Sequence, residues 1–295
     1  MRRYTAEPVT EVRAEHAEGP AWDARRDELL WVDQFAGLVH RGRVGSNGGL
    51  KVVRTYQVGS AVGAVVPVAA EGKGWLIAAG AGFAYLSAEG GVTVLAEPEA
   101  AVRKRNRMND GKCDPHGRFY AGSMAWSKQL GAGSLYRYAA NEGIATVLDD
   151  VTISNGLASP RAGDRMYYID TPTQRVDVFD LNDAGEPVTR RTAFTVDPAH
   201  GAPDGMTIDD EDCLWVALWG SGTLRRYAPS GETLAIIDVP GAPQVSSCAF
   251  AGTTLYVTTS QEDYPPALRL RHHGAGRIFA VDLPVGGPPA VPYRG

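Results

Sequence analysis

The chain repeats one pattern six times, and this repetition limits its fold more than any other feature. Each unit has a polar strand containing Gly, a turn rich in Asp, Gly or Asn, an apolar second strand and a third strand. Equivalent residues of the second strands follow one another at intervals of 41 to 48 residues; they are Trp31, Leu76, Phe119, Tyr167, Trp215 and Tyr256. Such a period, with several strands per unit, is typical of β-propeller blades. The sequence therefore predicts an all-β, six-bladed β-propeller that fills residues 1–295 as a single domain.

Composition agrees with this architecture. The 35 Gly and 19 Pro favour many short strands joined by turns over long helices. To close the ring, we expect the segment 6–12 to add a strand to the last blade, with closure by the C-terminal segment as the alternative. The second-strand aromatic residues are predicted to form the core between blades.

The charge of the chain argues against a nucleic-acid partner. A net charge of -5 does not suit a protein that binds polyanions, which requires clustered Lys and Arg. Arg103, Lys104, Arg105 and Arg107 form one short basic run, but no aromatic residues for base stacking are interleaved with it. The run is interpreted as a solvated loop, with Arg107 reserved for the site below.

The cysteines and the N-terminus predict a cytoplasmic protein without a membrane segment. Cys113, Cys213 and Cys248 are odd in number and widely spaced, which predicts neither a disulfide framework nor a zinc cluster. They are expected to be small buried residues in a reducing compartment. The first residues contain no apolar core for export, and the longest apolar run, around residues 61–70, is too short to span a membrane.

The repeat also predicts where a site lies. The innermost strands of all blades face the central channel, so equivalent positions converge there. The residues that precede the repeated Gly, or its substitute, are Glu18, Val62, Asp110, Asn155, Asp204 and Ser247. A purely structural ring would carry small or apolar residues, whereas four of these six are carboxylates or carboxamides. The column therefore indicates a metal or polyol site in the central channel.

The chemistry of this column favours a hard divalent cation. Glu18, Asn155 and Asp204 supply oxygen donors, and no Cys or His occupies a matching position. Two carboxylates balance the charge of a dication. Ca²⁺ is the first choice, with Mg²⁺, Mn²⁺, Zn²⁺ or Fe²⁺ as alternatives. Because such an ion can polarise a carbonyl and lower the pKa of water, an ester-like electrophile is the expected substrate.

Four ordered motifs at matching spacing resemble those of the SMP-30/gluconolactonase/regucalcin family. They are Glu18-Gly19-Pro20-Ala21-Trp22, Arg107-Met108-Asn109-Asp110-Gly111-Lys112, Ser154-Asn155-Gly156-Leu157 and Pro203-Asp204-Gly205-Met206, and Ser246-Ser247-Cys248 in the last blade adds to the likeness. The resemblance covers nearly the whole chain. It implies a six-bladed propeller and a metal-dependent hydrolase that opens sugar lactones, such as glucono-, galactono-, xylono- or arabinonolactone.

The resemblance also implies individual roles. Glu18, Asn155 and Asp204 would bind the metal, Asp204 would double as the general base, and Arg107 and Asn109 would hold the oxygens of the lactone. The repeat register points instead to Asp110, one residue after Asn109. Neighbouring residues of a regular strand face opposite sides, so both can reach the channel only if a bulge intervenes.

One position departs from the family pattern. Where the regucalcin branch has a substrate-contacting Glu, this chain has Ser127, and the adjacent Trp126 offers an apolar or stacking wall instead. Two alternative functions remain at this stage. One is a propeller phosphotriesterase of the diisopropylfluorophosphatase type, and the other is a non-catalytic calcium-binding propeller, since a fold does not determine a function.

Overall fold

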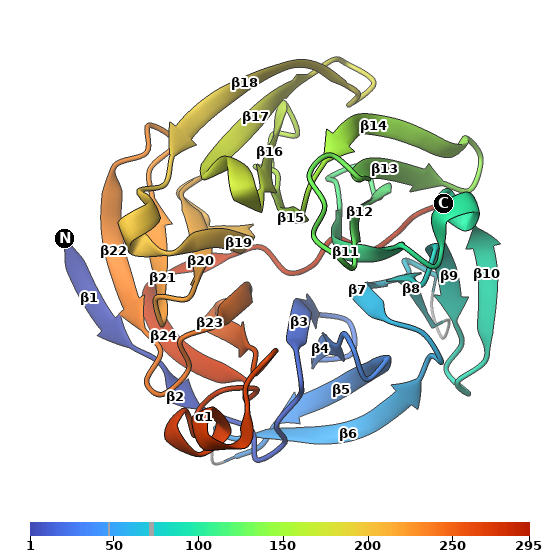
Figure 1. Ribbon diagram of the computed structural model, residues 1–295. Coiled ribbons are helices and arrows are strands. Elements are labelled where there is room, and N and C mark those ends of the chain that lie inside the picture. Colours follow the sequence, from blue (N-terminus) through green and yellow to red (C-terminus); the bar gives the residue numbers. More distant parts are fainter. Residues whose placement is uncertain (47, 71–73) are drawn as a thin grey trace.

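Six β-sheets surround a common axis in the computed structural model, which describes residues 1–46, 48–70 and 74–295 (Figure 1). Each sheet is one blade, and its strands follow one another outwards from the axis. The predicted six-bladed propeller is confirmed.

The first four blades have four antiparallel strands each. Blade 1 contains β3 (Ala17–Asp23), β4 (Glu28–Asp33), β5 (Leu38–Val44) and β6 (Leu50–Gln57), and blade 2 contains β7 (Val62–Pro67), β8 (Trp75–Ala79), β9 (Gly82–Leu86) and β10 (Val92–Ala96). Blade 3 contains β11 (Asn106–Cys113), β12 (Phe119–Ala125), β13 (Gly133–Ala139) and β14 (Gly143–Val151). Blade 4 contains β15 (Ser154–Ala158), β16 (Arg165–Asp170), β17 (Arg175–Leu181) and β18 (Pro187–Thr195).

The N-terminal segment completes the last two blades. Blade 5 contains β19 (Ala202–Ile208), β20 (Leu214–Trp219), β21 (Thr223–Tyr227), β22 (Thr233–Asp238) and β1 (Arg2–Thr5), and blade 6 contains β23 (Val245–Thr259), β24 (Phe279–Gly287) and β2 (Glu7–Pro8). The pairing of β2 with β24 confirms the predicted closure by the N-terminal segment. The parallel pairing of β1 with β22 was not predicted. The described helices are α1 (Pro266–Arg271) and three single 3₁₀ turns, Ala100–Val102, Thr171–Thr173 and Pro198–His200.

The core consists of six apolar clusters, each formed by two neighbouring blades. Alternation along the second strand of each blade produces this arrangement. In β8, Trp75 and Ile77 pack against blade 1, whereas Leu76 and Ala78 pack against blade 3. The second-strand aromatic residues therefore lie between blades, as predicted. The three cysteines are buried thiols.

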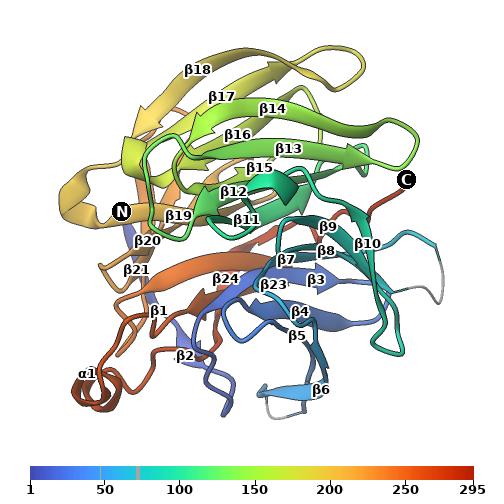
Figure 2. The ribbon, with the colours of Figure 1, turned by 45° about the vertical axis from the view of Figure 1, so that its right-hand side comes forward.

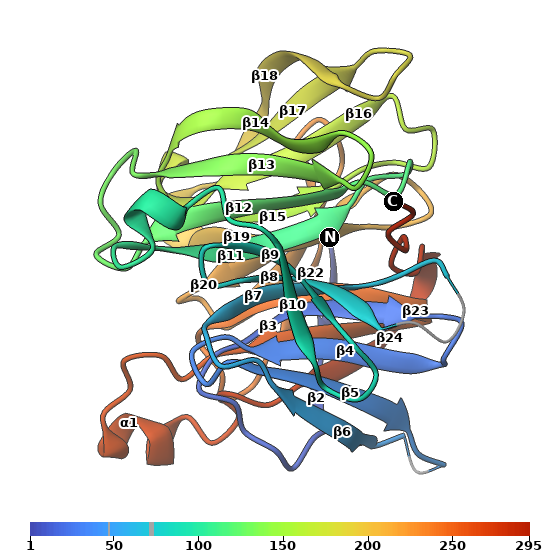
Figure 3. The same ribbon diagram turned by 90° about the vertical axis from the view of Figure 1, so that its right-hand side faces the viewer.

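The two ends of the ring differ. The side views in Figures 2 and 3 place α1 at one end of the axis and the C-terminal segment at the other. This segment crosses the ring and donates backbone hydrogen bonds from Ala290 to Trp22, from Tyr293 to Pro67 and from Arg294 to Gly117. It therefore ties blades 1, 2 and 3 together at the end away from α1.

Two surface expectations can be compared with the structure. Arg103, Lys104 and Arg105 are exposed, as expected for a solvated loop, whereas Arg107 is buried. In the part of the chain that the structure describes, no helix is long and apolar enough to cross a membrane.

Candidate active site

All five residues selected from the sequence line one cavity, with a volume of about 100 Å³. Glu18 comes from β3, Arg107 and Asn109 from β11, Asn155 from β15 and Asp204 from β19. The remaining lining residues are His16, Met124, Lys128, Ile153, Thr171, Ala202, Trp219 and Glu262. The four inner strands therefore bring the predicted set together at one end of the channel.

A repeated β-bulge resolves the conflict between Asn109 and Asp110. The pairing of β11 with β12 shifts register between Met108 and Gly111, and β3, β7, β15 and β19 shift at the equivalent place. A bulge lets two successive residues escape strict alternation. Asn109 and Asp110 are both buried, and Asn109 lines this cavity whereas Asp110 lines a second one. Asn109 and Asp110 are thus both channel residues, at different depths along the axis.

The repeated Gly allows the inner strands to approach closely. A Cβ on Gly63 would lie 2.1 Å from the carbonyl oxygen of Asn109, and one on Gly156 would lie 2.7 Å from that of Asp204. Such contacts leave no room for a side chain. Gly therefore seats the inner strand of one blade against the site residue of the next.

Three carboxylates crowd the axis. Glu18, Asp110 and Asp204 are all buried, and none of them forms an ion pair within the described residues. Burial and the charge of Asp110 raise the pKa of Glu18 to about 8. Burial, followed by the charges of Glu18 and Asp110, raises the pKa of Asp204 well above its usual range. This cluster is costly when ionised unless a cation compensates its charge.

Arg107 is clamped between two aromatic rings. Its guanidinium carbon lies 5.3 Å from the ring centre of Phe35 and 5.1 Å from that of Trp126, a cation–π arrangement. Trp126 was expected to be a wall for the substrate; in the structure its ring contacts the Arg107 guanidinium. Burial lowers the pKa of Arg107 to about 10, which leaves it protonated at neutral pH. Its buried Nε has no hydrogen-bond partner among the described residues, so a donor remains available.

Asn109 links Arg107 to Asn155. Its Oδ1 accepts hydrogen bonds from Arg107 Nη1 (2.6 Å) and Gln34 Nε2 (3.1 Å). Its Nδ2 donates to the carbonyl oxygen of Ser154 (2.8 Å) and to Asn155 Oδ1 (2.9 Å). A carboxamide has two donors and two acceptor lone pairs, so this side chain is fully engaged. In this arrangement it orients its neighbours, and contact with a ligand would require the exchange of one of these bonds.

Several lining residues were not identified from the sequence. His16, Lys128, Thr171 and Glu262 come from connections between strands, where the sixfold repeat provides no register. Ser127, which was expected to stand in place of the substrate-contacting Glu of the regucalcin branch, is exposed and lies outside the cavity. Its neighbour Lys128 reaches the cavity and approaches Glu262 at 3.3 Å.

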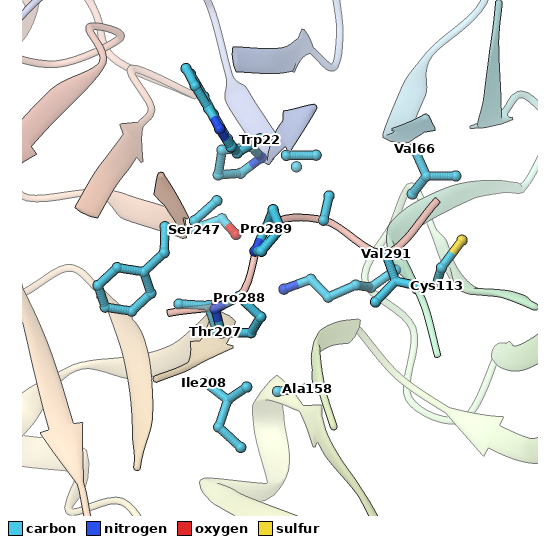
Figure 4. Close-up of a pocket in the computed structure, with 18 of the residues that line it drawn as sticks. Trp22, Val66, Cys113, Ala158, Thr207, Ile208, Ser247, Pro288, Pro289 and Val291 are labelled. Carbon is cyan, nitrogen blue, oxygen red and sulfur yellow. The ribbon is translucent and has the colours of Figure 1, made fainter. Parts of the chain in front are cut away.

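A second cavity of about 70 Å³ lies toward the other end of the axis. Figure 4 shows Pro288, Pro289 and Val291 of the C-terminal segment crossing it, with Trp22, Ile208 and Ser247 around them. Its walls are mainly apolar, and Asp110 and Lys112 supply its charged groups. None of the five residues selected from the sequence lines it, so the candidate chemistry belongs to the first cavity.

Known proteins resemble this chain over nearly its full length. The family model described as "SMP-30/Gluconolactonase/LRE-like region" matches residues 16–261. A Bacillus subtilis protein named "Putative sugar lactone lactonase YvrE" is 32% identical, with 97% of each chain covered. Regucalcin from Sus scrofa is 33% identical over 94% of each chain. The structure of a calcium-binding protein, regucalcin, from Agrobacterium tumefaciens matches with a TM-score of 0.91 at 25% identity, covering 100% of this chain and 99% of that one.

Proposed function

The chain belongs to the SMP-30/gluconolactonase/LRE-like family, and we propose that it is a divalent-metal-dependent hydrolase that opens a sugar lactone to its sugar acid. One observation carries this proposal: a single cavity collects two buried carboxylates, two carboxamides and a buried arginine with a free donor. The name of the Bacillus subtilis relative supports lactones as substrates. Residues 1–295 would act as one unit in the cytoplasm.

The donor set fits a hard cation. Within the described residues, no three His, Cys, Asp or Glu side chains are placed to hold a metal ion, so the set needs the amide oxygen of Asn155 beside Glu18 and Asp204. Two buried carboxylates without an ionic partner fit a dication, which would offset their repulsion. Oxygen ligands favour Ca²⁺, which agrees with the calcium-binding Agrobacterium tumefaciens regucalcin that this chain resembles. When bound, the ion would polarise the lactone carbonyl and acidify a nearby water.

The residues of the chain would divide the remaining chemistry. Asp204 would accept a proton from the water that attacks the carbonyl carbon, as the new C–O bond forms. Arg107 would donate hydrogen bonds to the oxygen on which negative charge develops. The tetrahedral centre would then expel the ring oxygen, which takes up the proton as a hydroxyl and leaves a sugar acid. Asn109 would keep Arg107 and Asn155 oriented through the hydrogen bonds described above.

The proposal is tested by pH-stat hydrolysis of glucono-, galactono-, xylono- and arabinonolactone. Protein treated with EDTA is compared with protein to which Ca²⁺, Mg²⁺, Mn²⁺, Zn²⁺ or Fe²⁺ is restored singly. Metal-restored turnover of at least one lactone is the expected result. The absence of acceleration over spontaneous hydrolysis with every metal would refute the proposal. Parallel assays with diisopropyl fluorophosphate would then separate a phosphotriesterase from a non-catalytic calcium-binding protein.

The role of Asp204 needs a separate experiment because it is assigned both as ligand and as base. Asp204→Asn is compared with the wild type at metal concentrations that saturate each protein, with metal binding measured by calorimetry. We expect kcat to fall by roughly 10²- to 10⁴-fold, the usual contribution of general base catalysis. Full metal-dependent activity in the variant would show that another group takes the proton.

A further inference from the structure

Glu262 and Lys128 form an ion pair between opposite sides of the ring. Lys128 lies in the connection between β12 and β13 of blade 3, and Glu262 follows β23 of blade 6. These two blades face each other across the axis (Figure 1). Lys128 Nζ nevertheless lies 3.3 Å from Glu262 Oε1, and both residues line the candidate active site. The pair therefore spans the cavity that would hold the substrate.

The backbone of Glu262 is held in place, and one oxygen of its carboxylate is free. Its N–H donates to Ser260 Oγ at 2.9 Å, and its carbonyl accepts from Gln244 Nε2 at 3.3 Å. Lys128 contacts only Oε1. His16 Nδ1 lies 4.0 Å from Oε2, and in the described part of the molecule Oε2 accepts no hydrogen bond.

The charges that line the cavity suit a neutral substrate. Three carboxylates, Glu18, Asp204 and Glu262, face two cations, Arg107 and Lys128. If a dication offsets Glu18 and Asp204, and Lys128 offsets Glu262, Arg107 is the charged group lining this cavity that remains without a counterpart in it. Asp110 and Lys112 line the second cavity instead. The charge of Arg107 matches the single negative charge that develops as a neutral lactone becomes a sugar-acid anion. A substrate with a phosphate or a second carboxylate would meet Glu262 as a repulsive neighbour.

We propose that Glu262, held across the cavity by Lys128, binds hydroxyl groups of the substrate and selects lactones that carry no additional anionic group. This inference rests on the lactonase function proposed above. Glu262 would supply from blade 6 the carboxylate that Ser127, exposed on blade 3, does not provide. A hydroxyl that donates to an ionised carboxylate forms one of the stronger hydrogen bonds available to a polyol.

Two variants that break the same ion pair test this role. Glu262→Gln removes the negative charge, and Lys128→Met removes the positive charge at similar side-chain length. Glu97→Gln is the control, because it removes an exposed ion pair with Arg103 at 3.4 Å that lies outside the cavity. Values of kcat and KM are measured for D-glucono-1,5-lactone and for its 6-phosphate, and unfolding temperatures confirm that each variant is folded.

The substrate-binding role predicts opposite changes in the two variants. In Glu262→Gln, KM for the neutral lactone should rise roughly 10- to 100-fold with kcat within about twofold, as expected for one lost charged hydrogen bond. The preference for the neutral lactone over the phosphate should fall at least tenfold by the same reasoning. In Lys128→Met that preference should increase. A merely structural ion pair would instead change both variants in the same direction, and that result, or an unchanged KM in Glu262→Gln, would overturn the proposal.

A binding measurement separates this inference from the lactonase proposal. The probe is 1,5-anhydro-D-glucitol, which keeps the ring hydroxyls but has no carbonyl to hydrolyse, titrated by calorimetry in the presence of Ca²⁺. Binding by the wild type and its loss in Glu262→Gln would support recognition of polyols by Glu262 even if no lactone were turned over. Equal binding by the two proteins, or none by the wild type, would count against it.

Discussion

Gly63 packs so closely against Asn109 that the methyl group added by Gly63→Ala should reduce activity. In Gly63→Ala, the new Cβ would lie 2.1 Å from the Asn109 carbonyl oxygen and 2.7 Å from its Cα, whereas real Cβ contacts are essentially never shorter than 3.0 Å. The two strands must therefore separate by about 0.9 Å at this point, the difference between 3.0 and 2.1 Å. The atoms in conflict belong to the backbone, so no side chain can rotate away.

This displacement would disturb the site more than the fold. Asn109 fixes Arg107 and Asn155 through hydrogen bonds of 2.6 and 2.9 Å, which a movement of this size would break or lengthen. A misplacement of about 1 Å can cost roughly 100-fold in rate, so we expect kcat/KM to fall by about that factor. Overpacking of this kind costs about 1 to 3 kcal/mol, or roughly 2 to 10 °C in Tm.

The assay is pH-stat lactone hydrolysis at saturating metal, at a temperature well below the Tm of each variant, combined with thermal unfolding. Gly91→Ala is the matched control, because the nearest atom to its new Cβ is Ser87 Oγ at 3.4 Å, an ordinary contact. It should change neither quantity. A folded Gly63→Ala protein with kcat/KM within threefold of the wild type would refute the argument that this backbone contact positions Arg107 and Asn155.

Three further predictions follow from burial and stacking. In EDTA, the free energy of unfolding should fall as pH rises from about 4.5 to about 8, because the pKa of Glu18 is about 8 in the folded state and 4.5 at its ordinary value. Denaturant titrations at several pH values should show this decrease, and saturating Ca²⁺ should reduce it. A free energy of unfolding that does not change with pH in EDTA would contradict the prediction. Trp126→Ala removes one of the two rings that contact Arg107, an interaction worth about 0.5 to 2 kcal/mol. We therefore expect kcat/KM to fall about 2- to 30-fold and Tm to fall by a few degrees at most, because this side chain is 48% exposed, whereas Trp126→Phe should retain most activity. Tyr293→Ala empties a buried position between blades 2 and 3 at the far end of the axis. It should lower the free energy of unfolding, measured by urea titration, by roughly 3 kcal/mol without altering kcat/KM.

The sequence specified those parts of the structure that the repeat enforces. Trp31 and Trp215 mark second strands because each blade must present apolar residues to both neighbours, and both residues are buried between blades. Glu18, Asn155 and Asp204 were found because they share one position of the repeat, and all three line one cavity. The position of β1 beside β22 was not predictable in the same way, since this pairing occurs once.

The site residues that lie in the connections between strands could not be identified from the sequence. Lys128 and Glu262 are far apart in the chain and occupy no repeated position, so only the closed ring brings them within 3.3 Å. The bulge in β11 was not predictable from strict alternation along a strand, which allows only one of Asn109 and Asp110 to face the channel. A local signal did exist, because the inner strands of blades 1 to 5 carry Gly at the position where their pairing shifts.

The glycines that let neighbouring inner strands approach each other also affect which blades can carry the proposed metal ligands. Where Gly63 meets the backbone of Asn109, blade 2 contributes Val62 to the axial column, an apolar residue that supports the site without entering it. Gly156 seats blade 4 against Asp204 of blade 5, so the position of this proposed metal ligand depends on the absence of a side chain on the neighbouring blade. The carboxylates at the axis are therefore held in mutual repulsion by packing between strands, and six apolar clusters farther out must offset that cost. A substitution that loosens an inner-strand contact lets the axial carboxylates move apart, which reduces their mutual repulsion. A bound cation would then have less repulsion to offset, so such a substitution should weaken metal affinity before it unfolds the protein.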